Sequence, residues 1–434
     1  MHASSALAQD AAQKSLLSPE TEADALFARL LVKPDDLDAT FRYSSLQAQL
    51  GDQEAAIGGL ERMLFYNPDL PRVRLELGLL YFRLGSYEMA RANFEAAIAG
   101  KNVPEDVVIR VRGFLKEIDR RVADHQFSFF GTAGFRHQSN ANGGPDSQIV
   151  RALGNDAVLS SQFRRRPDTN AFGSAQMRHV YDFENQRGDS CETNATAYYA
   201  KQFHVRRYDL GVAQVDTGPR LTISNAAGLS FRPYATAAFL PLGGRPYLAS
   251  PGAGASVRWL DLNGAMIEPG LEINSRRFYN SSNFPNATNQ NGSLLTTYVN
   301  AGAPLPMTVY WRAQARFYYS AAYARYRPYS YNQVGLDASL AHDFEPLVKV
   351  PTDRRWTGTL FAGWSDTKYR AIDTIVDPTF TRHDRLIRFG AALDMPIYEG
   401  FGIAAQASYT INRSTLANFR NRNFAISLAP TYRF

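Results

Sequence analysis

The hydrophobic residues of this chain follow two different periods, one on each side of about residue 124. Between residues 18 and 122, apolar positions recur three and four residues apart, as on the buried face of a helix. From residue 124 to the carboxyl terminus they alternate with polar positions, as in strands with one apolar and one wet face. The pattern predicts a helical domain over residues 18–123 and β-structure over residues 124–434.

The alternation is clearest in three stretches, 309–321, 386–397 and 401–411. In each stretch large apolar residues occupy one parity, while any charged residues share the other parity with Gly, Ser, Thr or Gln. Charges on the polar side are expected of a water-filled lumen with lipid on the opposite face. Soluble sheets seldom have strands as long as these, so we predict a membrane barrel rather than a soluble β-sandwich.

Fourteen strands are predicted, and most long connections follow odd-numbered strands while most short turns follow even-numbered ones. Outer-membrane barrels have short periplasmic turns and long outer loops, so this alternation supports the count. The predicted fold class is α plus membrane β-barrel: a short N-terminal helical domain resembling tetratricopeptide repeats, then a 14-stranded antiparallel transmembrane β-barrel. The predicted strands are 125–139, 172–184, 191–203, 207–223, 229–241, 247–261, 266–279, 293–304, 308–324, 332–344, 355–369, 384–397, 401–411 and 423–434.

The chain ends on the alternating stretch NFAISLAPTYRF. An aromatic-ended last strand resembles the closing strand of bacterial outer-membrane barrels, so Tyr432 and Phe434 are the expected closure signal. Pro430 has no N–H to donate and is expected to weaken the ladder of this strand. That weakness motivates the hypothesis that the barrel opens between its first and last strands.

A 34-residue repeat organises the helical part, with residues 37–70 aligning beneath residues 71–104. Gly51 and Gly85, which are 34 residues apart, are expected at the turn within each helix pair. Such arrays hold a peptide or a partner domain on a concave surface, although two helix pairs can also simply support a neighbour. The tetratricopeptide packing signature of the second copy consists of Leu77, Gly78, Tyr81, Ala90, Phe94 and Ala97.

The amino terminus carries no complete targeting signal. Residues 6–8 read Ala-Leu-Ala, like a signal-peptide cleavage site, but no charged or long apolar region precedes them. Residues 1–17 are therefore interpreted either as the remnant of a truncated signal peptide or as a disordered tail.

The sequence offers no catalytic constellation. The 7 histidines are scattered, Cys191 is the only cysteine, and no HExxH, GxSxG or nucleotide-binding loop occurs. The glycine-rich PGAGAS at 251–256 is interpreted as a hairpin bend. We therefore expect no enzyme, no catalytic residues, no metal and no cofactor. The net charge of +6 is spread along the strands, which argues against a nucleic-acid surface.

Several charged residues fall on the parity predicted to face the lumen. A cationic lumen concentrates anions and could conduct an anionic polymer. Alternatively, the arginines pair with the aspartates and brace the barrel. The candidate lumen or passage residues are Arg258, Arg312, Arg316, Arg388, Asp337 and Asp394.

Three stretches together resemble the surface lipoprotein assembly modulator (Slam) family. They are RLELGLLYFRLGSYEMARANFEAA in the second repeat, FLKEIDRR at the end of the capping helix predicted over residues 103–121, and FSFFGTAGFRHQSNAN at the opening of the first strand. The resemblance implies a translocon in a Gram-negative outer membrane, with its repeats in the periplasm. It also implies partners: a client lipoprotein or secreted protein, outer-membrane lipids and the barrel assembly machinery.

Two other function classes remain open from the sequence. Exopolysaccharide export porins also join periplasmic repeats to a barrel, usually with much longer arrays than this one. A diffusion porin with an accessory domain is the third alternative.

Overall fold

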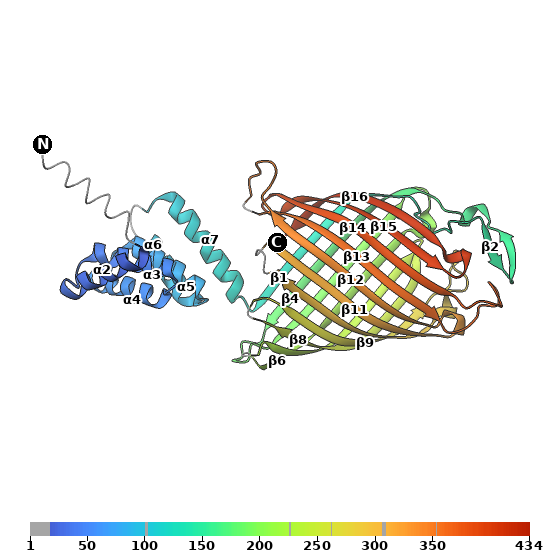
Figure 1. Ribbon diagram of the computed structural model, residues 1–434, viewed down its shortest axis with the longest axis horizontal. Coiled ribbons are helices and arrows are strands. Elements are labelled where there is room, and N and C mark those ends of the chain that lie inside the picture. Colours follow the sequence, from blue (N-terminus) through green and yellow to red (C-terminus); the bar gives the residue numbers. More distant parts are fainter. Residues whose placement is uncertain (1–17, 100–102, 225–226, 262, 306–309, 353) are drawn as a thin grey trace. The chain divides into compact units, whose positions relative to one another are not determined.

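The computed structural model describes residues 18–99, 103–224, 227–261, 263–305, 310–352 and 354–434. The chain divides into two compact units, Met1–Ala123 and Asp124–Phe434. Helices make up the first unit and a closed β-barrel the second (Figure 1). No helix among the described residues has the length and hydropathy needed to cross a bilayer.

The helices begin and end where local signals place them. Asp36 and Asp52 cap two helices by accepting hydrogen bonds from backbone N–H groups at 3.0 Å. Gly51 and Gly85 lie just after the ends of the helices at 37–50 and 71–83, with φ of +92° and +75°, a conformation that glycine adopts without strain. The described helices are α2 (Pro19–Val32), α3 (Leu37–Leu50), α4 (Gln53–Tyr66), α5 (Pro71–Arg83), α6 (Tyr87–Ile98) and α7 (Glu105–Val122).

The two helix pairs, α3–α4 and α5–α6, pack through small residues in different ways. In the second pair, Gly78 lies against the ring of Phe94, and a Cβ there would lie 2.6 Å from a ring carbon. In the first pair, Ser44 stands 34 residues before Gly78 and packs against Gly59. In both pairs a glycine, which has no side chain, allows the two helices to approach closely. Of the packing signature, Leu77, Gly78, Ala90, Phe94 and Ala97 are buried and Tyr81 is half-buried.

Tyr81 links the two helix pairs through its hydroxyl, which donates a hydrogen bond to Glu61 on α4. Burial, followed by the carboxylate of Glu61, raises the pKa of Tyr81 to about 12. The phenol is therefore neutral at physiological pH and remains a donor.

The second unit is a closed antiparallel barrel in which β1 pairs with both β4 and β16. The prediction of fourteen barrel strands after a helical domain is confirmed within the described residues. The barrel strands are β1 (His125–Gln138), β4 (Asp168–Asp182), β5 (Ser190–Gln202), β6 (Leu210–Ser224), β7 (Leu229–Leu242), β8 (Arg245–Leu260), β9 (Met266–Phe278), β10 (Gly292–Pro304), β11 (Trp311–Ala324), β12 (Tyr331–Phe344), β13 (Trp356–Tyr369), β14 (His383–Tyr398), β15 (Phe401–Ser414) and β16 (Asn421–Arg433).

The predicted loop after the first strand contains two further strands, β2 (Ile149–Ala152) and β3 (Asn155–Val158), which form a hairpin. Its turn residues Leu153 and Gly154 both have positive φ, at 51° and 80°. Because leucine occupies the first of these positions, the turn lacks the Asn-Gly or Asp-Gly sequence that usually indicates a two-residue hairpin turn. Other differences are shifts of strand ends, the largest being the start of β4 at Asp168 instead of 172.

The prediction of a hairpin bend at 251–256 is wrong, because β8 runs through this segment without interruption. Its glycines make room for side chains of neighbouring strands. A Cβ at Gly254 would lie 2.4 Å from the ring of Tyr234, and one at Gly252 would lie 2.1 Å from the Asn274 amide oxygen. The glycines therefore serve close side-chain packing, not a turn.

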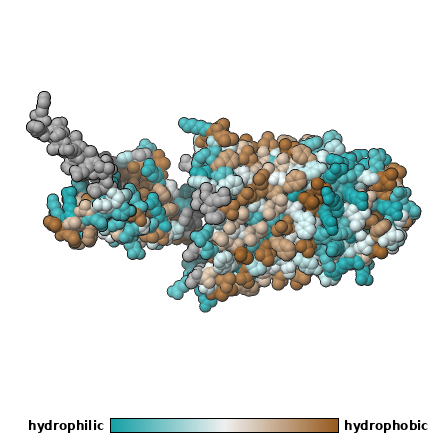
Figure 2. Space-filling view, viewed as in Figure 1, coloured by the Kyte–Doolittle hydropathy of each residue, from teal (hydrophilic) through white to brown (hydrophobic). Residues whose placement is uncertain are grey.

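The two faces of the barrel wall differ in chemistry. Large apolar side chains are exposed on the outer face, such as Phe317 (51%) and Leu360 (62%), and each is next in sequence to a residue that lines an interior cavity. In Figure 2 hydrophobic residues dominate the visible middle of the barrel, with hydrophilic residues towards its ends. An apolar surface this extensive is far larger than soluble monomers expose, and it matches barrels that span lipid.

Candidate functional site

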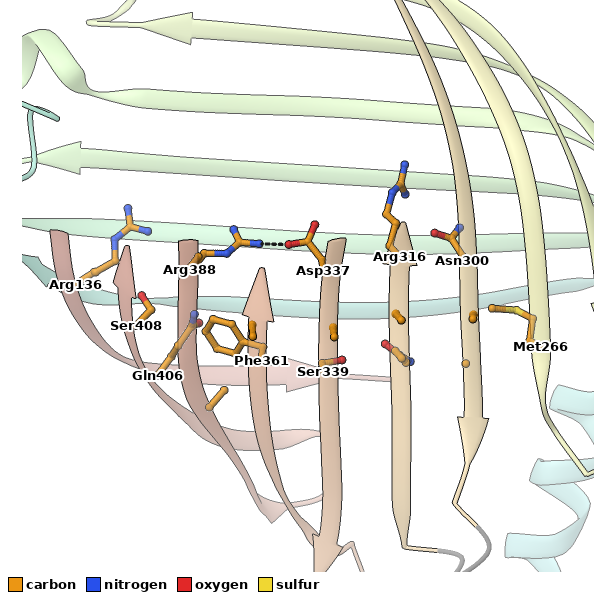
Figure 3. Close-up of a pocket in the computed structure, with 17 residues that line it drawn as sticks. Arg136, Met266, Asn300, Arg316, Asp337, Ser339, Phe361, Arg388, Gln406 and Ser408 are labelled. Carbon is orange, nitrogen blue, oxygen red and sulfur yellow. Dashed lines mark hydrogen bonds and ion pairs between the residues drawn. The ribbon is translucent and has the colours of Figure 1, made fainter. Parts of the chain in front are cut away.

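The interior of the barrel contains a cavity of about 790 Å³. About half of the residues that line it are polar, and the lining comes from strands on one side of the barrel (Figure 3). The side chains labelled in Figure 3 are Arg136, Met266, Asn300, Arg316, Asp337, Ser339, Phe361, Arg388, Gln406 and Ser408. Two of the predicted lumen residues with positive charge, Arg316 and Arg388, and one with negative charge, Asp337, are among them.

Strand register aligns these charged residues in one row. Asn300 on β10 faces Arg316 on β11, which in turn faces Asp337 on β12. Asp337 faces Gly363 on β13, which faces Arg388 on β14. The row therefore follows the hydrogen-bonding direction of the sheet, across five neighbouring strands.

Gly363 allows an ion pair to form across a whole strand. Arg388 reaches past Gly363 and places its guanidinium nitrogen 3.1 Å from the carboxylate of Asp337. A Cβ at position 363 would lie 2.3 Å from the same carboxylate oxygen. Any side chain at this position would therefore displace the ion pair.

Arg316 makes a different contact. Its guanidinium carbon lies 4.5 Å from the centre of the Tyr298 ring. Asp337, its register neighbour, is within 4.0 Å of Arg388 but not of Arg316. Within the described part of the chain, Arg316 has no carboxylate partner.

Tyr298 is itself held in place. Its ring lies over Gly270 on β9, where a Cβ would be 2.5 Å away. Its hydroxyl lies 3.1 Å from that of Tyr234, which also donates to Glu272 at 3.1 Å. The ring beneath Arg316 is thus fixed from two sides.

The other predicted lumen residues lie outside this cavity and are paired. Arg258 binds Glu268 at 2.9 Å, and Arg312 donates to Asp343 at 3.0 Å. Asp394 pairs with Arg433 and lines a second interior cavity of about 330 Å³. These three residues fit the bracing alternative better than the conducting one.

A largely buried ionic cluster lies on β4 to β9, near the connections that follow β4, β6 and β8. We call it the ionic belt, and of its members only Arg258 was among the lumen residues predicted from the sequence. Glu192 is its centre and lies 2.9 Å from Arg220, 3.1 Å from Arg178 and 3.5 Å from Arg232. The sequence signal for the ionic belt is the number of charged residues on the polar parity of β5 to β9. Its members are Arg178, Glu192, Asp216, Arg220, Arg232, Arg258 and Glu268.

The seam between β1 and β16 has a gap in its register. Thr132 pairs with Thr431, and the next paired residues are Phe135 and Leu428. Between them, the hydroxyl of Thr132 donates to the carbonyl of Pro430 at 2.9 Å. The interruption therefore lies at the proline.

The terminal aromatic residues close this seam. Phe434 exchanges two backbone hydrogen bonds of 3.1 Å with Phe129 on β1, and its ring stacks on that of Phe129 at 6.0 Å. The ring of Tyr432 lies 4.8 Å from that of Phe401. Both terminal residues thus contact neighbouring strands at the outer face.

Loops at the opposite end of the barrel from Phe434 are joined at Arg151 in the β2–β3 hairpin (Figure 1). Its guanidinium donates to Asp377 at 2.7 Å and its backbone N–H to the Asn418 side chain at 3.0 Å. Hydrogen bonds from Thr379 and the ion pair with Arg151 lower the pKa of Asp377 to about 2. Three loops that are distant in sequence are thereby connected.

No protein-family model matches the chain, and no characterised protein matches it in sequence. Among solved structures, one similar barrel is a bacterial polysaccharide outer membrane secretin, with 9% identity, 71% of this chain and 98% of that chain covered, and a TM-score of 0.34. Another is the outer membrane channel DcaP of Acinetobacter baumannii, with 8% identity, 72% and 98% covered, and a TM-score of 0.37.

A shorter match is PcrH in complex with the chaperone binding region of PopD, with 17% identity, 27% of this chain and 90% of that chain covered, and a TM-score of 0.24. With TM-scores below 0.5, these likenesses assign neither a family nor a function to the chain.

Proposed function

We propose that the chain is an outer-membrane translocation channel that moves a periplasmic client protein, a lipoprotein or a secreted protein, to the cell surface. The observation that carries the proposal is a closed barrel with an apolar outer face and a polar interior, preceded in the same chain by two helix pairs. Outer-membrane lipids and the barrel assembly machinery are the further partners that such a protein requires.

The barrel's own loops support an orientation. Its first strand starts, and its last strand ends, at the end where the connections are shorter on average. Short connections face the periplasm in outer-membrane barrels, whereas the joined loops around Arg151 would face outwards. We therefore propose that the helical unit, which precedes β1 in the chain, is periplasmic.

The helical unit has features suited to holding a client. Large apolar side chains of several helices remain exposed, including Leu31 (70%), Phe65 (83%) and Ile109 (65%). Exposed apolar residues on helix-pair arrays suit binding of an apolar peptide segment. The polar interior cavity would then offer such a segment a wet route through the membrane.

A deletion strain tests the proposal. Protease shaving and whole-cell labelling, read by quantitative proteomics, should show one or two proteins lost from the surface and accumulated in the periplasm. A plasmid copy of the gene should restore them. An unchanged surface proteome in the deletion strain would contradict the proposal.

Export of an anionic polysaccharide is the second candidate, and the interior lining favours it. The cavity presents Arg136, Arg316 and Arg388 against a single carboxylate, together with amide and hydroxyl groups. In that case the deletion strain would lose a capsule or exopolysaccharide while its surface proteins stayed in place.

A further inference from the structure

We propose that the lumen wall carries a binding site for organic carboxylates, centred on the guanidinium of Arg316. This inference goes beyond the proposed function, because it concerns small anions in the lumen whichever client the channel moves. It rests on the row of residues from β10 to β14 described above.

Among the described residues, the guanidinium of Arg316 is a positive charge in this row that no carboxylate neutralises. Asp337 stands opposite Arg316 in register, yet its carboxylate pairs with Arg388 through the gap at Gly363. The ion pair neutralises both of its members. The positive charge of Arg316 therefore stays uncompensated inside the cavity that it lines.

The arginines that brace the barrel wall are bound differently from Arg316. Those arginines have carboxylate partners within 4.0 Å, whereas among the described residues Arg316 contacts the face of Tyr298 and pairs with no carboxylate. A ring contact uses no hydrogen-bond acceptor, so the N–H donors of Arg316 remain available. The paired arginines are Arg178, Arg220, Arg232, Arg258, Arg312, Arg388 and Arg433.

Two amide side chains lie beside Arg316. Asn300 faces it from β10, and Gln314 lies two residues before it on the same face of β11. Both amides line the cavity and can donate to an oxygen acceptor. A guanidinium flanked by two amides suits a carboxylate, which accepts through two oxygens.

Preorganisation strengthens the site. Tyr298 is fixed between Gly270 and the hydroxyl of Tyr234, so the cation above its ring has little freedom to lose on binding. In Figure 3 the Arg316 side chain points away from the wall, on the same side as Arg388 and Asp337. The figure thus places the free guanidinium where a solute in the lumen can reach it.

Planar-bilayer recording of the purified full-length protein tests the site. Glutarate should reduce the single-channel current, while glutaramide, a neutral molecule of the same length, should not. Arg316→Gln should weaken the glutarate block about fivefold, the scale of a solvent-accessible charge pair. The same variant should lower the chloride-over-potassium permeability ratio, measured from the reversal potential in a KCl gradient.

Arg312→Gln is the matched control, because it removes the same charge from the same strand while Arg312 is paired with Asp343 and lies outside the cavity. It should leave the glutarate block unchanged. Equal block of the wild type and Arg316→Gln, or equal weakening by both variants, would overturn the proposal. So would equal block by glutarate and glutaramide.

Discussion

The contact between Gly78 and Phe94 decides whether an alanine at position 78 stabilises or destabilises the helical unit. In a helix, alanine is favoured over glycine by about 1 kcal/mol, so Gly→Ala substitutions usually stabilise. At position 78, however, the new Cβ would lie 2.6 Å and 2.7 Å from two carbons of the Phe94 ring. Overpacking of this kind costs about 1–3 kcal/mol. We therefore expect Gly78→Ala to destabilise the helical unit by about 1 kcal/mol net.

Two further variants isolate the cause. Gly58→Ala on α4 meets nothing within 4 Å, so it should stabilise the same unit by up to about 1 kcal/mol. Phe94→Leu removes the ring that obstructs position 78, and leucine occupies the equivalent place, Leu60, in the first repeat. Adding Gly78→Ala to Phe94→Leu should therefore stabilise the helical unit relative to Phe94→Leu alone.

The assay is urea unfolding of the full-length protein in detergent, followed by circular dichroism at 222 nm, where the helices dominate the signal. The free energy of unfolding of each variant gives the coupling between positions 78 and 94. If Gly78→Ala stabilised the wild type as much as Gly58→Ala does, the reasoning about Phe94 would be refuted.

Three further predictions concern the barrel. Glu192→Gln leaves the buried arginines of the ionic belt without their central carboxylate, so it should lower the free energy of unfolding by about 3 kcal/mol, measured by guanidinium unfolding in lipid vesicles. Glu345→Gln removes a carboxylate from an exposed ion pair with Arg355 and should lower it by under about 1 kcal/mol. Equal losses would contradict this account. Gly134→Ala would place a Cβ 2.3 Å from the carbonyl oxygen of Leu428 across the seam, so it should lower the temperature at which the barrel unfolds in SDS gels. Gly173→Ala should leave that temperature unchanged, because the atom nearest to its new Cβ would be 3.9 Å away. Asp377 has its pKa lowered from an ordinary 3.8 to about 2, so the stabilisation by its carboxylate is complete above about pH 4 and is lost as the pH falls towards 2. The hydrogen-exchange protection of the β2–β3 hairpin, relative to the exchange rate of an unstructured chain at the same pH, should fall only in that window. A fall in protection already at pH 6 would count against the Arg151–Asp377 pair.

Much of the fold follows from local patterns. Strict alternation marks the barrel strands, because each of them has one wet and one apolar face over ten residues or more. The helix turns at Gly51 and Gly85 were predicted from the 34-residue spacing of these glycines, and the structure adds that both have positive φ. Such features depend on neighbours within one or two turns of chain, so the sequence shows them directly.

Features that depend on register between strands could not be predicted. Arg388 and Asp337 are 51 residues apart, and their pairing requires Gly363 to stand between them on β13. The glycines at 252 and 254 suggested a turn. The side chains that fill the space beside them come from neighbouring strands, which the local sequence does not show. The ionic belt could not be predicted for the same reason, since Glu192 contacts arginines on four other strands.

The most direct test of translocation places a photo-crosslinking amino acid at Ser339, which lines the interior cavity, and at Leu336, which is exposed on the outer face of the same strand. Both variants are expressed in living cells that still display the client. We expect the client protein to be crosslinked from position 339, while position 336 yields lipid adducts. Crosslinks to the client from position 336 and none from position 339, with surface display intact, would contradict passage through the lumen.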